Sequence, residues 1–308
     1  MKTLRQREQI TAYGFLALQL IGLAVFVLGP LVASFFYTFV HWDLISPPEW
    51  VGLKNWQYLV SDPRIKKVLW NTIRFIVFGT TSYLGLSLFM AVMLNNSRRG
   101  TGLFRTIFFL PWILSPIAVG ITWTWVLNTR SGPVSQVFDL VGLQSPEFLL
   151  DARYAMPTIA LVTTWQGLGY GMTLYLAGLQ SIPDILYDAA KVDGANGFQQ
   201  FRHVTFPLLS PTILFLTVTS LIGAFQLYDI VVMMTGGITY TPPGGPEDST
   251  RTIVLYLYNQ MFEYSERISG LGYAATIAWM LAILIFIVTA VQWIFSKKWV
   301  FYMGEEKQ

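Results

Sequence analysis

The sequence contains no cysteine, which excludes disulfide bonds, thiolate metal sites and cysteine nucleophiles. Histidine is almost as scarce: only His41 and His203 occur, far apart in the chain, so no histidine-based metal site is expected. Charged residues make up 12% of the 308 residues, whereas a soluble domain carries about 25%. The net charge of +3 is weak support for nucleic-acid binding, because basic residues in a lipid-embedded chain face anionic headgroups. These shortages indicate a membrane protein with neither a catalytic nor a metal site.

Long apolar runs are what the sequence has instead. Hydrophobic residues make up 54% of the chain, and the mean hydropathy is +0.51. A helix needs about 20 apolar residues to cross a hydrocarbon core of roughly 30 Å. Because backbone groups in lipid must bond within their own segment, we predict an all-α, polytopic transmembrane helical bundle. Six spans are expected, at residues 13–40, 68–94, 103–127, 154–180, 211–235 and 271–295.

The first run is far longer than the roughly 7–15 apolar residues of a signal peptide, so it is predicted to be a retained span. Six crossings place both termini on one side. The pairs Arg98-Arg99 and Lys297-Lys298 then lie where the positive-inside rule expects them, so both termini are predicted to be cytoplasmic. The Pro- and Gly-rich loop 236–250 is external in this topology and has no assigned role. Asn71 and Arg74 are predicted to form an external anchor of the second span.

The segment 181–210, between the fourth and fifth spans, is more regular than a linker. Pro183 and Asp184 suit the first turn of a helix, where a missing N–H is harmless and a negative charge meets the positive dipole end. One apolar stripe follows at the spacing i, i+4 and i+7, made of Ile185, Ala189 and Val192.

Gly194 lies where this helix is expected to end, because glycine accepts the left-handed conformation found at helix ends. A second short helix is predicted over residues 197–204, and Pro207 is predicted to break the chain before the fifth span. The segment 181–210 therefore forms a helix–glycine–helix elbow on the cytoplasmic side in the predicted topology.

The elbow resembles the EAA loop of ATP-binding-cassette (ABC) importer permeases. That loop reads Glu-Ala-Ala, three residues, Gly, nine residues and Ile-x-Leu-Pro. The same spacing runs through Asp188-Ala189-Ala190-Lys191-Val192-Asp193-Gly194-Ala195 and Val204-Thr205-Phe206-Pro207. Asp188, Val204 and Phe206 replace the usual Glu, Ile and Leu and keep charge or apolarity. Val51-Gly52-Leu53-Lys54-Asn55-Trp56 and Met234-Thr235-Gly236-Gly237 are similar to elements of the maltose-type first permease subunit of the carbohydrate-uptake branch.

The resemblance implies an ABC type I importer permease, a single transmembrane domain over residues 1–308 in a prokaryotic cell membrane. It implies that the elbow docks on separate ATPase subunits through Asp188, Ala189, Ala190, Asp193, Gly194, Ala195 and Pro207. ATP and Mg would be bound by those partners, since this sequence has no G-x-x-x-x-G-K-[ST] loop. The expected complex adds a second permease subunit, two ATPases and an extracytoplasmic substrate-binding protein in the lipid bilayer. The expected substrate is a sugar or oligosaccharide, with a glycerol-phosphate compound as the alternative.

A sugar path needs hydrogen-bonding groups and aromatic faces inside the bundle, because hydroxyls lose water on entry. The fourth and fifth spans offer such side chains: Trp165, Gln166, Tyr170, Gln226, Tyr228 and Asp229. Along a straight helix from Pro211, Asp229 is expected near the external interface. Helix packing or interface anchoring explains each of these residues as an alternative.

Two other protein classes fit less well. A self-sufficient secondary transporter usually needs ionisable residues at mid-membrane, and the predicted spans place none there. An intramembrane enzyme needs paired Asp or His residues, or a base beside a Ser nucleophile, and no predicted span supplies them.

Overall fold

The computed structural model describes residues 4–95, 100–237, 243–262 and 270–301, which are mainly helical. Within them, the strands are the two-residue pair β1 (Val40–His41) and β2 (Glu49–Trp50). The predicted all-α class is confirmed. The chain divides into two compact units, Met1–Pro63 with Leu257–Met280, and Arg64–Tyr256 with Leu281–Gln308.

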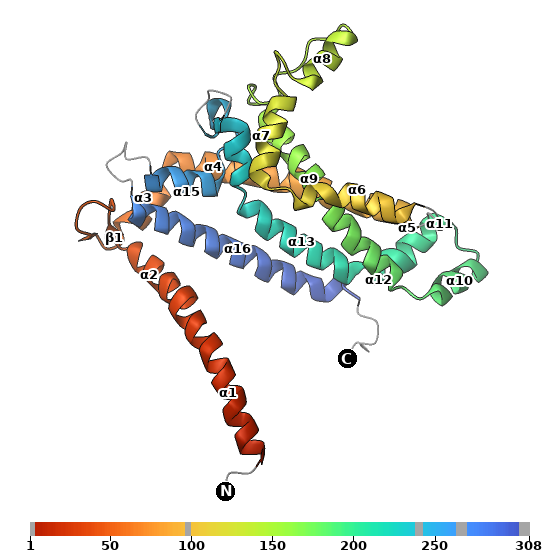
Figure 1. Cartoon of the computed structure of the whole chain (residues 1–308), viewed down its shortest axis with the longest axis horizontal. Helices are drawn as coiled ribbons and strands as arrows, with labels where there is room; N and C mark the ends of the chain where they lie inside the picture. Colours follow the sequence, from red (N-terminus) through yellow and green to blue (C-terminus); the bar gives the residue numbers. More distant parts are fainter. Residues whose placement is uncertain (1–3, 96–99, 238–242, 263–269, 302–308) are drawn as a thin grey trace. The chain divides into compact units, whose positions relative to one another are not determined.

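The first unit begins with a continuous helix made of α1 (Leu4–Leu23), the π-helical η1 (Ala24–Leu28) and α2 (Gly29–Tyr37) (Figure 1). Its side chains are largely apolar and exposed, as expected of a helix solvated by lipid. The β1–β2 hairpin and α3 (Lys54–Ser61) follow. The buried Asn55 side chain donates to the carbonyls of Thr38 and Val40, both at 3.0 Å, and so ties α3 to the hairpin.

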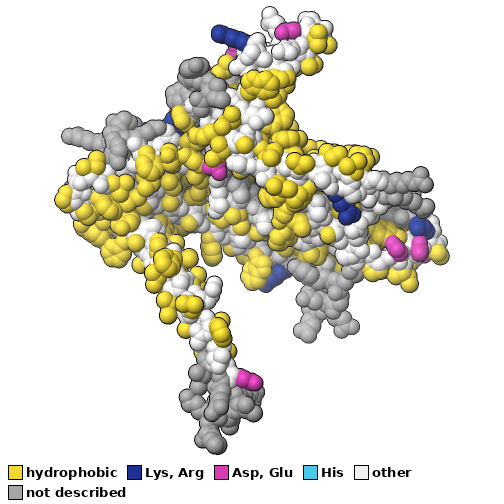
Figure 2. Space-filling model, viewed as in Figure 1, with side chains coloured by type: hydrophobic (Ala, Val, Ile, Leu, Met, Phe, Trp, Pro, Cys, Tyr) yellow, Lys and Arg dark blue, Asp and Glu magenta, His cyan; other side chains and the backbone are white. Residues whose placement is uncertain are grey.

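The second unit is built around α9 (Ala155–Gln180), which packs against α5 (Thr81–Asn95) and α6 (Thr101–Ile113). Its other elements are α4 (Pro63–Phe75), η2 (Ile76–Thr80), α7 (Pro116–Val126), α8 (Pro133–Leu140), α10 (Asp184–Val192), α11 (Gly197–Gln200), η3 (Phe201–Thr205), α12 (Phe206–Leu208), α13 (Ser210–Phe225), α14 (Asp229–Val232), η4 (Met233–Gly237) and η5 (Pro246–Asp248). Two further helices, α15 (Ile253–Phe262) and α16 (Leu271–Trp299), pass from one unit into the other. Figure 2 shows apolar side chains over most of the visible face of the long helices, with charged side chains over α8 and α10.

Within the described residues, three helices are long and apolar enough to cross a membrane: Thr11–Tyr37, Pro63–Asn95 and Leu271–Trp299. Two bent helix pairs raise this number to five if each pair is one span. The predicted span 154–180 corresponds to α9, whose polar residues lower its hydropathy and whose faces are mostly buried in the protein. The number six is compatible with these findings and stays a prediction.

The predicted span 103–127 is not one straight helix. It consists of α6 and α7, bent by 98°. The break falls at Leu114 and Ser115, which are extended, because Pro116 disfavours helical geometry in the residue before it.

The predicted span 211–235 is interrupted as well. Helix α13 ends at Phe225, and the chain turns through Gln226 and Tyr228 before α14 begins. The Leu227 carbonyl in this turn accepts a hydrogen bond of 2.9 Å from the Thr252 hydroxyl. The assumption of one straight helix from Pro211 to Asp229 is therefore wrong, and the position of Asp229 near the external interface stays a prediction.

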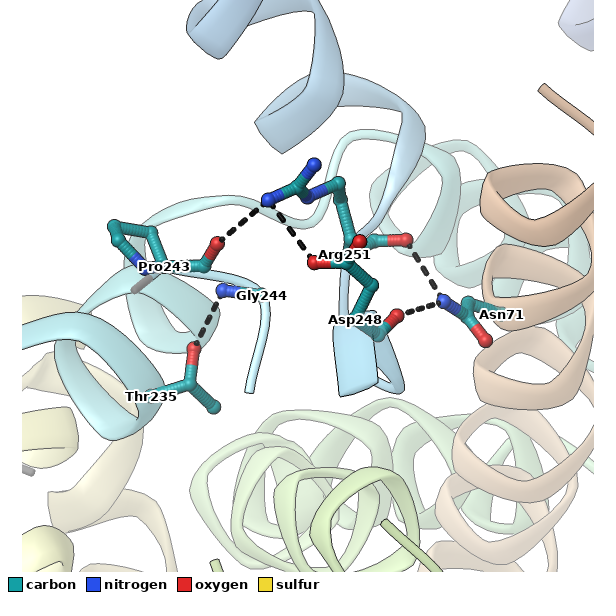
Figure 3. Close-up of polar contacts among 6 residues, drawn as sticks. All are labelled: Asn71, Thr235, Pro243, Gly244, Asp248 and Arg251. Atoms are coloured by element: carbon teal, nitrogen blue, oxygen red, sulfur yellow. Dashed lines mark hydrogen bonds and ion pairs between the residues drawn. The ribbon is translucent and has the colours of Figure 1, made fainter. Parts of the chain in front are cut away.

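The turn over residues 243–251 is held by a compact polar cluster (Figure 3). The Asn71 amide, buried on α4, donates to the carbonyl of Asp248 at 2.7 Å and to that of Arg251 at 3.2 Å. Arg251 also pairs with the Asp248 carboxylate at 3.0 Å, and the Thr235 hydroxyl accepts from the Gly244 N–H at 3.3 Å. Asn71 is thus a buried connector between α4 and this turn, and its expected role as an external anchor is wrong. Residues 238–242 of the loop 236–250 lie outside the described residues.

Candidate functional site: an exposed elbow and a polar cavity

The first arm of the elbow is α10, which begins where the sequence predicts. Asp184 is its first residue and Pro183 caps it in an extended conformation. Its last turn ends in a glycine-terminated cap: Gly194 adopts a φ of 78°, the Gly194 N–H donates to the Lys191 carbonyl at 3.0 Å, and the Ala195 N–H donates to the Ala190 carbonyl at 2.9 Å. This pair of bonds satisfies carbonyls that the helix end would leave open. The predicted glycine stop is confirmed.

The second arm starts with a reciprocal cap. The Asn196 side chain accepts from the Gln199 N–H at 3.0 Å, and the Gln199 side chain accepts from the Asn196 N–H at 2.8 Å. Helix then runs to Leu208, so Pro207 lies inside the helix, and its predicted break is wrong by two residues. The π-helical turn η3 loosens the hydrogen-bond pattern just before the proline. The bend of 64° falls after it, before α13.

The apolar stripe of α10 points away from the protein. Ile185 is 73% exposed and Val192 is 87% exposed. Asp188 forms an exposed ion pair of 3.0 Å with Lys191, and Ala189, Asp193 and Gly194 are exposed beside it. An exposed apolar stripe on an ordered helix, rimmed by charge, is a surface suited to contact with another protein.

The two arms are joined to each other and to the spans. The Tyr187 hydroxyl lies 3.0 Å from the Thr205 hydroxyl, and the Gln200 amide donates to the Ala195 carbonyl at 2.8 Å. At the base of the elbow, the Ser210 hydroxyl accepts from the Phe301 N–H at 2.8 Å. The elbow is therefore fixed internally and attached to the chain beyond the last helix.

A cavity of about 520 Å³ lies within the second unit. It brings together five of the six predicted path residues: Gln166 and Tyr170 of α9, Gln226 and Tyr228 of the turn after α13, and Asp229 at the start of α14. Trp165 does not line this cavity: it is 40% exposed, with its ring 5.4 Å from that of Trp123.

Two aromatic rings form a platform in the cavity wall. Trp112 and Tyr170 stack with ring centroids 4.6 Å apart and planes 16° apart. Gln166 lies beside them and donates to the Leu114 carbonyl at 3.1 Å, which satisfies an acceptor freed by the break between α6 and α7. The cavity is thus built at the helix break.

Two wall residues were missed from the sequence. Trp112 was hidden in an apolar run, and only the fold brings it to Tyr170. Thr80 belongs to the π-helical turn η2, and its buried hydroxyl has no hydrogen-bond partner. Such turns often occur at functional sites, but nothing in the sequence predicts this one.

The cap of the second elbow arm was also missed, although the spacing Asn196-x-x-Gln199 is a pattern from which it can be predicted.

Comparison with known proteins identifies the family. The family described as "Binding-protein-dependent transport system inner membrane component" matches residues 84–300. The chain is 33% identical over 305 residues to the probable ABC transporter permease protein YesP of Bacillus subtilis, covering 98% of this chain and 95% of YesP. It is 33% identical over 309 residues to the lactose transport system permease protein LacF of Rhizobium radiobacter, covering 99% and 98%.

A solved structure shares the fold. It is the crystal structure of a bacterial ABC transporter involved in the import of the acidic polysaccharide alginate. The TM-score is 0.81 at 20% identity, over 97% of this chain and 98% of the other. With the family match and the full-length relatives, the conclusion is direct: this chain belongs to the family of binding-protein-dependent transport system inner membrane components.

Proposed function

We propose that this chain is a permease subunit of an ATP-driven importer that passes a carbohydrate into the cytoplasm. The observation that carries the proposal is the elbow: a rigid, glycine-terminated helix whose apolar residues Ile185 and Val192 are exposed. In the proposed assembly this face docks on a separate ATPase subunit, and Asp188 and Asp193 lie at the rim of the contact.

The cavity supplies the other half of the proposal. Its aromatic platform and polar wall suit a ligand with both apolar C–H faces and hydroxyl groups, as a sugar has. The lactose system of the relative LacF supports the same substrate class. Both termini and the elbow are cytoplasmic in this proposal.

Reconstitution tests the proposal. The chain, a second permease subunit, two ATPases and an extracytoplasmic binding protein are placed in vesicles, and ATP-driven uptake of radiolabelled sugar is measured. Uptake is expected only when all components and ATP are present. Uptake that continues without the ATPases, driven by an ion gradient, would contradict the coupling role.

A matched pair of elbow variants sharpens the test. Val192→Asp places a charge on the proposed contact and should abolish co-purification of the ATPase, because a buried unpaired charge opposes docking. Phe198→Asp changes a side chain that is 70% exposed on the other arm and serves as the control. Equal loss in both variants would refute docking through the α10 stripe.

A further inference from the structure

The charge and the hydrogen-bonding groups of the residues that line the cavity favour one class of ligand. We propose that this cavity selects an uncharged saccharide over an anionic one. The inference rests on the proposed function and adds to it the charge of the substrate.

The first argument is electrostatic. Among the described residues that line the cavity, none is Lys, Arg or His, and Asp229 is the one Asp or Glu. Proteins hold carboxylates and phosphates mainly with Arg, Lys or helix N-termini. The cavity reaches the start of α7 at Pro116, which has no N–H to donate, and the first residue of the short α14 is Asp229 itself. Here the Asp229 carboxylate repels an anion, and its effect is stronger inside a membrane protein than in water.

The second argument concerns the hydroxyl groups of the cavity wall, whose protons are already used in hydrogen bonds to the backbone. Four wall hydroxyls donate to backbone carbonyls: Thr163 to Ile159 at 3.0 Å, Thr164 to Gly79 at 3.4 Å, Thr219 to Phe215 at 2.8 Å and Ser220 to Thr217 at 3.2 Å. Each hydroxyl keeps lone pairs that can accept a further bond. These four hydroxyls therefore offer acceptor oxygens to a ligand. A sugar hydroxyl can donate to them, whereas an ionised carboxylate or phosphate can only accept.

The third argument separates sugars from small phosphate esters. Trp112 and Tyr170 both line the cavity and stack on one another, and a pyranose ring has a C–H face that can pack against an aromatic surface. Glycerol 3-phosphate has no ring to place there. The buried, unpartnered Thr80 hydroxyl gives a ligand hydroxyl one further hydrogen-bonding site.

The absence of cysteine makes a direct test possible. Ser220→Cys introduces a single thiol into this chain at the cavity wall. In the assembled importer, its reaction rates with a cationic (trimethylammonium) and an anionic (sulfonate) methanethiosulfonate reagent are measured, each relative to free 2-mercaptoethanol. We expect the cationic reagent to be favoured by about threefold or more. A ratio of one, or a preference for the anionic reagent, would overturn the proposal.

Two charge variants locate the effect. Asp229→Asn should bring the ratio close to one. Asp139→Asn makes the same change on the exposed helix α8, outside the cavity lining, and should leave the ratio unchanged. An equal change in both variants would mean that the preference does not come from the cavity, and the proposal would fail.

Ligand protection completes the experiment. Labelling of Ser220→Cys is repeated with lactose, with trigalacturonate and with glycerol 3-phosphate. Protection by either anion but not by lactose would overturn the proposal, whereas protection by lactose alone is the expected result. ATP-driven uptake measured in the same vesicles tests the permease function separately. Uptake of an anion through a cavity that prefers the anionic reagent would refute only the charge selection.

Discussion

The sharpest prediction concerns the backbone at Gly194. Its φ of 78° lies in the left-handed region, which costs other L-residues about 1–2 kcal/mol. An added Cβ would meet nothing within 4 Å, so the cost of Gly194→Val is conformational and not a clash. A cost of this size changes a conformational equilibrium by a factor of about 5–30.

The affected equilibrium lies between an elbow whose two arms keep the observed arrangement and an elbow in which the turn at Gly194 has changed conformation. A valine that leaves the left-handed region breaks the two capping bonds, from Gly194 to Lys191 and from Ala195 to Ala190. The second arm then leaves its position relative to α10. We expect Gly194→Val to lower ATP-driven uptake by about the same factor of 5–30, while the amount of the protein in the membrane stays unchanged.

The elbow offers its own controls. Gly197 also has open space around an added Cβ, but its φ is not positive, so Gly197→Val should transport far better than Gly194→Val. Gly194→Asn should also be tolerated, because Asn adopts the left-handed conformation more readily than other residues. The assay is sugar uptake with co-purification of the ATPase subunit. Full activity in Gly194→Val, or equal losses at both glycines, would refute the reasoning.

Three further predictions follow from the spans. Trp112→Ala should weaken sugar binding by about two- to tenfold through loss of the stacked platform, with Trp112→Phe largely restoring it, measured as the sugar concentration for half-maximal uptake. Asn71→Leu should destabilise the protein by about 1–3 kcal/mol, because two carbonyls lose their donor, and a lowered thermal unfolding midpoint in detergent checks this. Gly169→Ala should prevent correct assembly, since its Cβ would collide with the Phe108 backbone. Gly85→Ala, in open space, should be neutral, and both are read by size-exclusion chromatography.

The elbow was predictable because its signals are local. Pro183, Asp184 and Gly194 each act through their own backbone chemistry. Asp184 and Gly194 take their expected roles, and Pro183 lies one position earlier than expected, as the cap before α10. Pro207 shows the limit of this reasoning: the π-helical turn before it absorbs the missing N–H, so the helix continues through the proline.

The cavity was only partly predictable because it depends on contacts between distant segments. Polar residues inside apolar runs pointed to Gln166 and Tyr170, but not to the partner ring of Trp112. The interruption after Phe225 has no proline or glycine at the break. It is stabilised by Thr252, whose contribution only the folded chain reveals. The depth of Asp229 therefore cannot be counted along one straight helix, because the helix is interrupted before it.

The hydrogen bond between Ser210 and Phe301 joins the base of the elbow, where α13 begins, to the segment that follows α16. If α10 docks as proposed, a displacement of α10 that reaches Ser210 would act both on α13, which begins there, and on the segment that follows α16. Both helices would then be connected to the elbow directly, through Ser210, and not one through the other. Ser210→Ala would remove the hydrogen bond to Phe301, and with it this connection to the segment after α16, while the covalent connection to α13 stays.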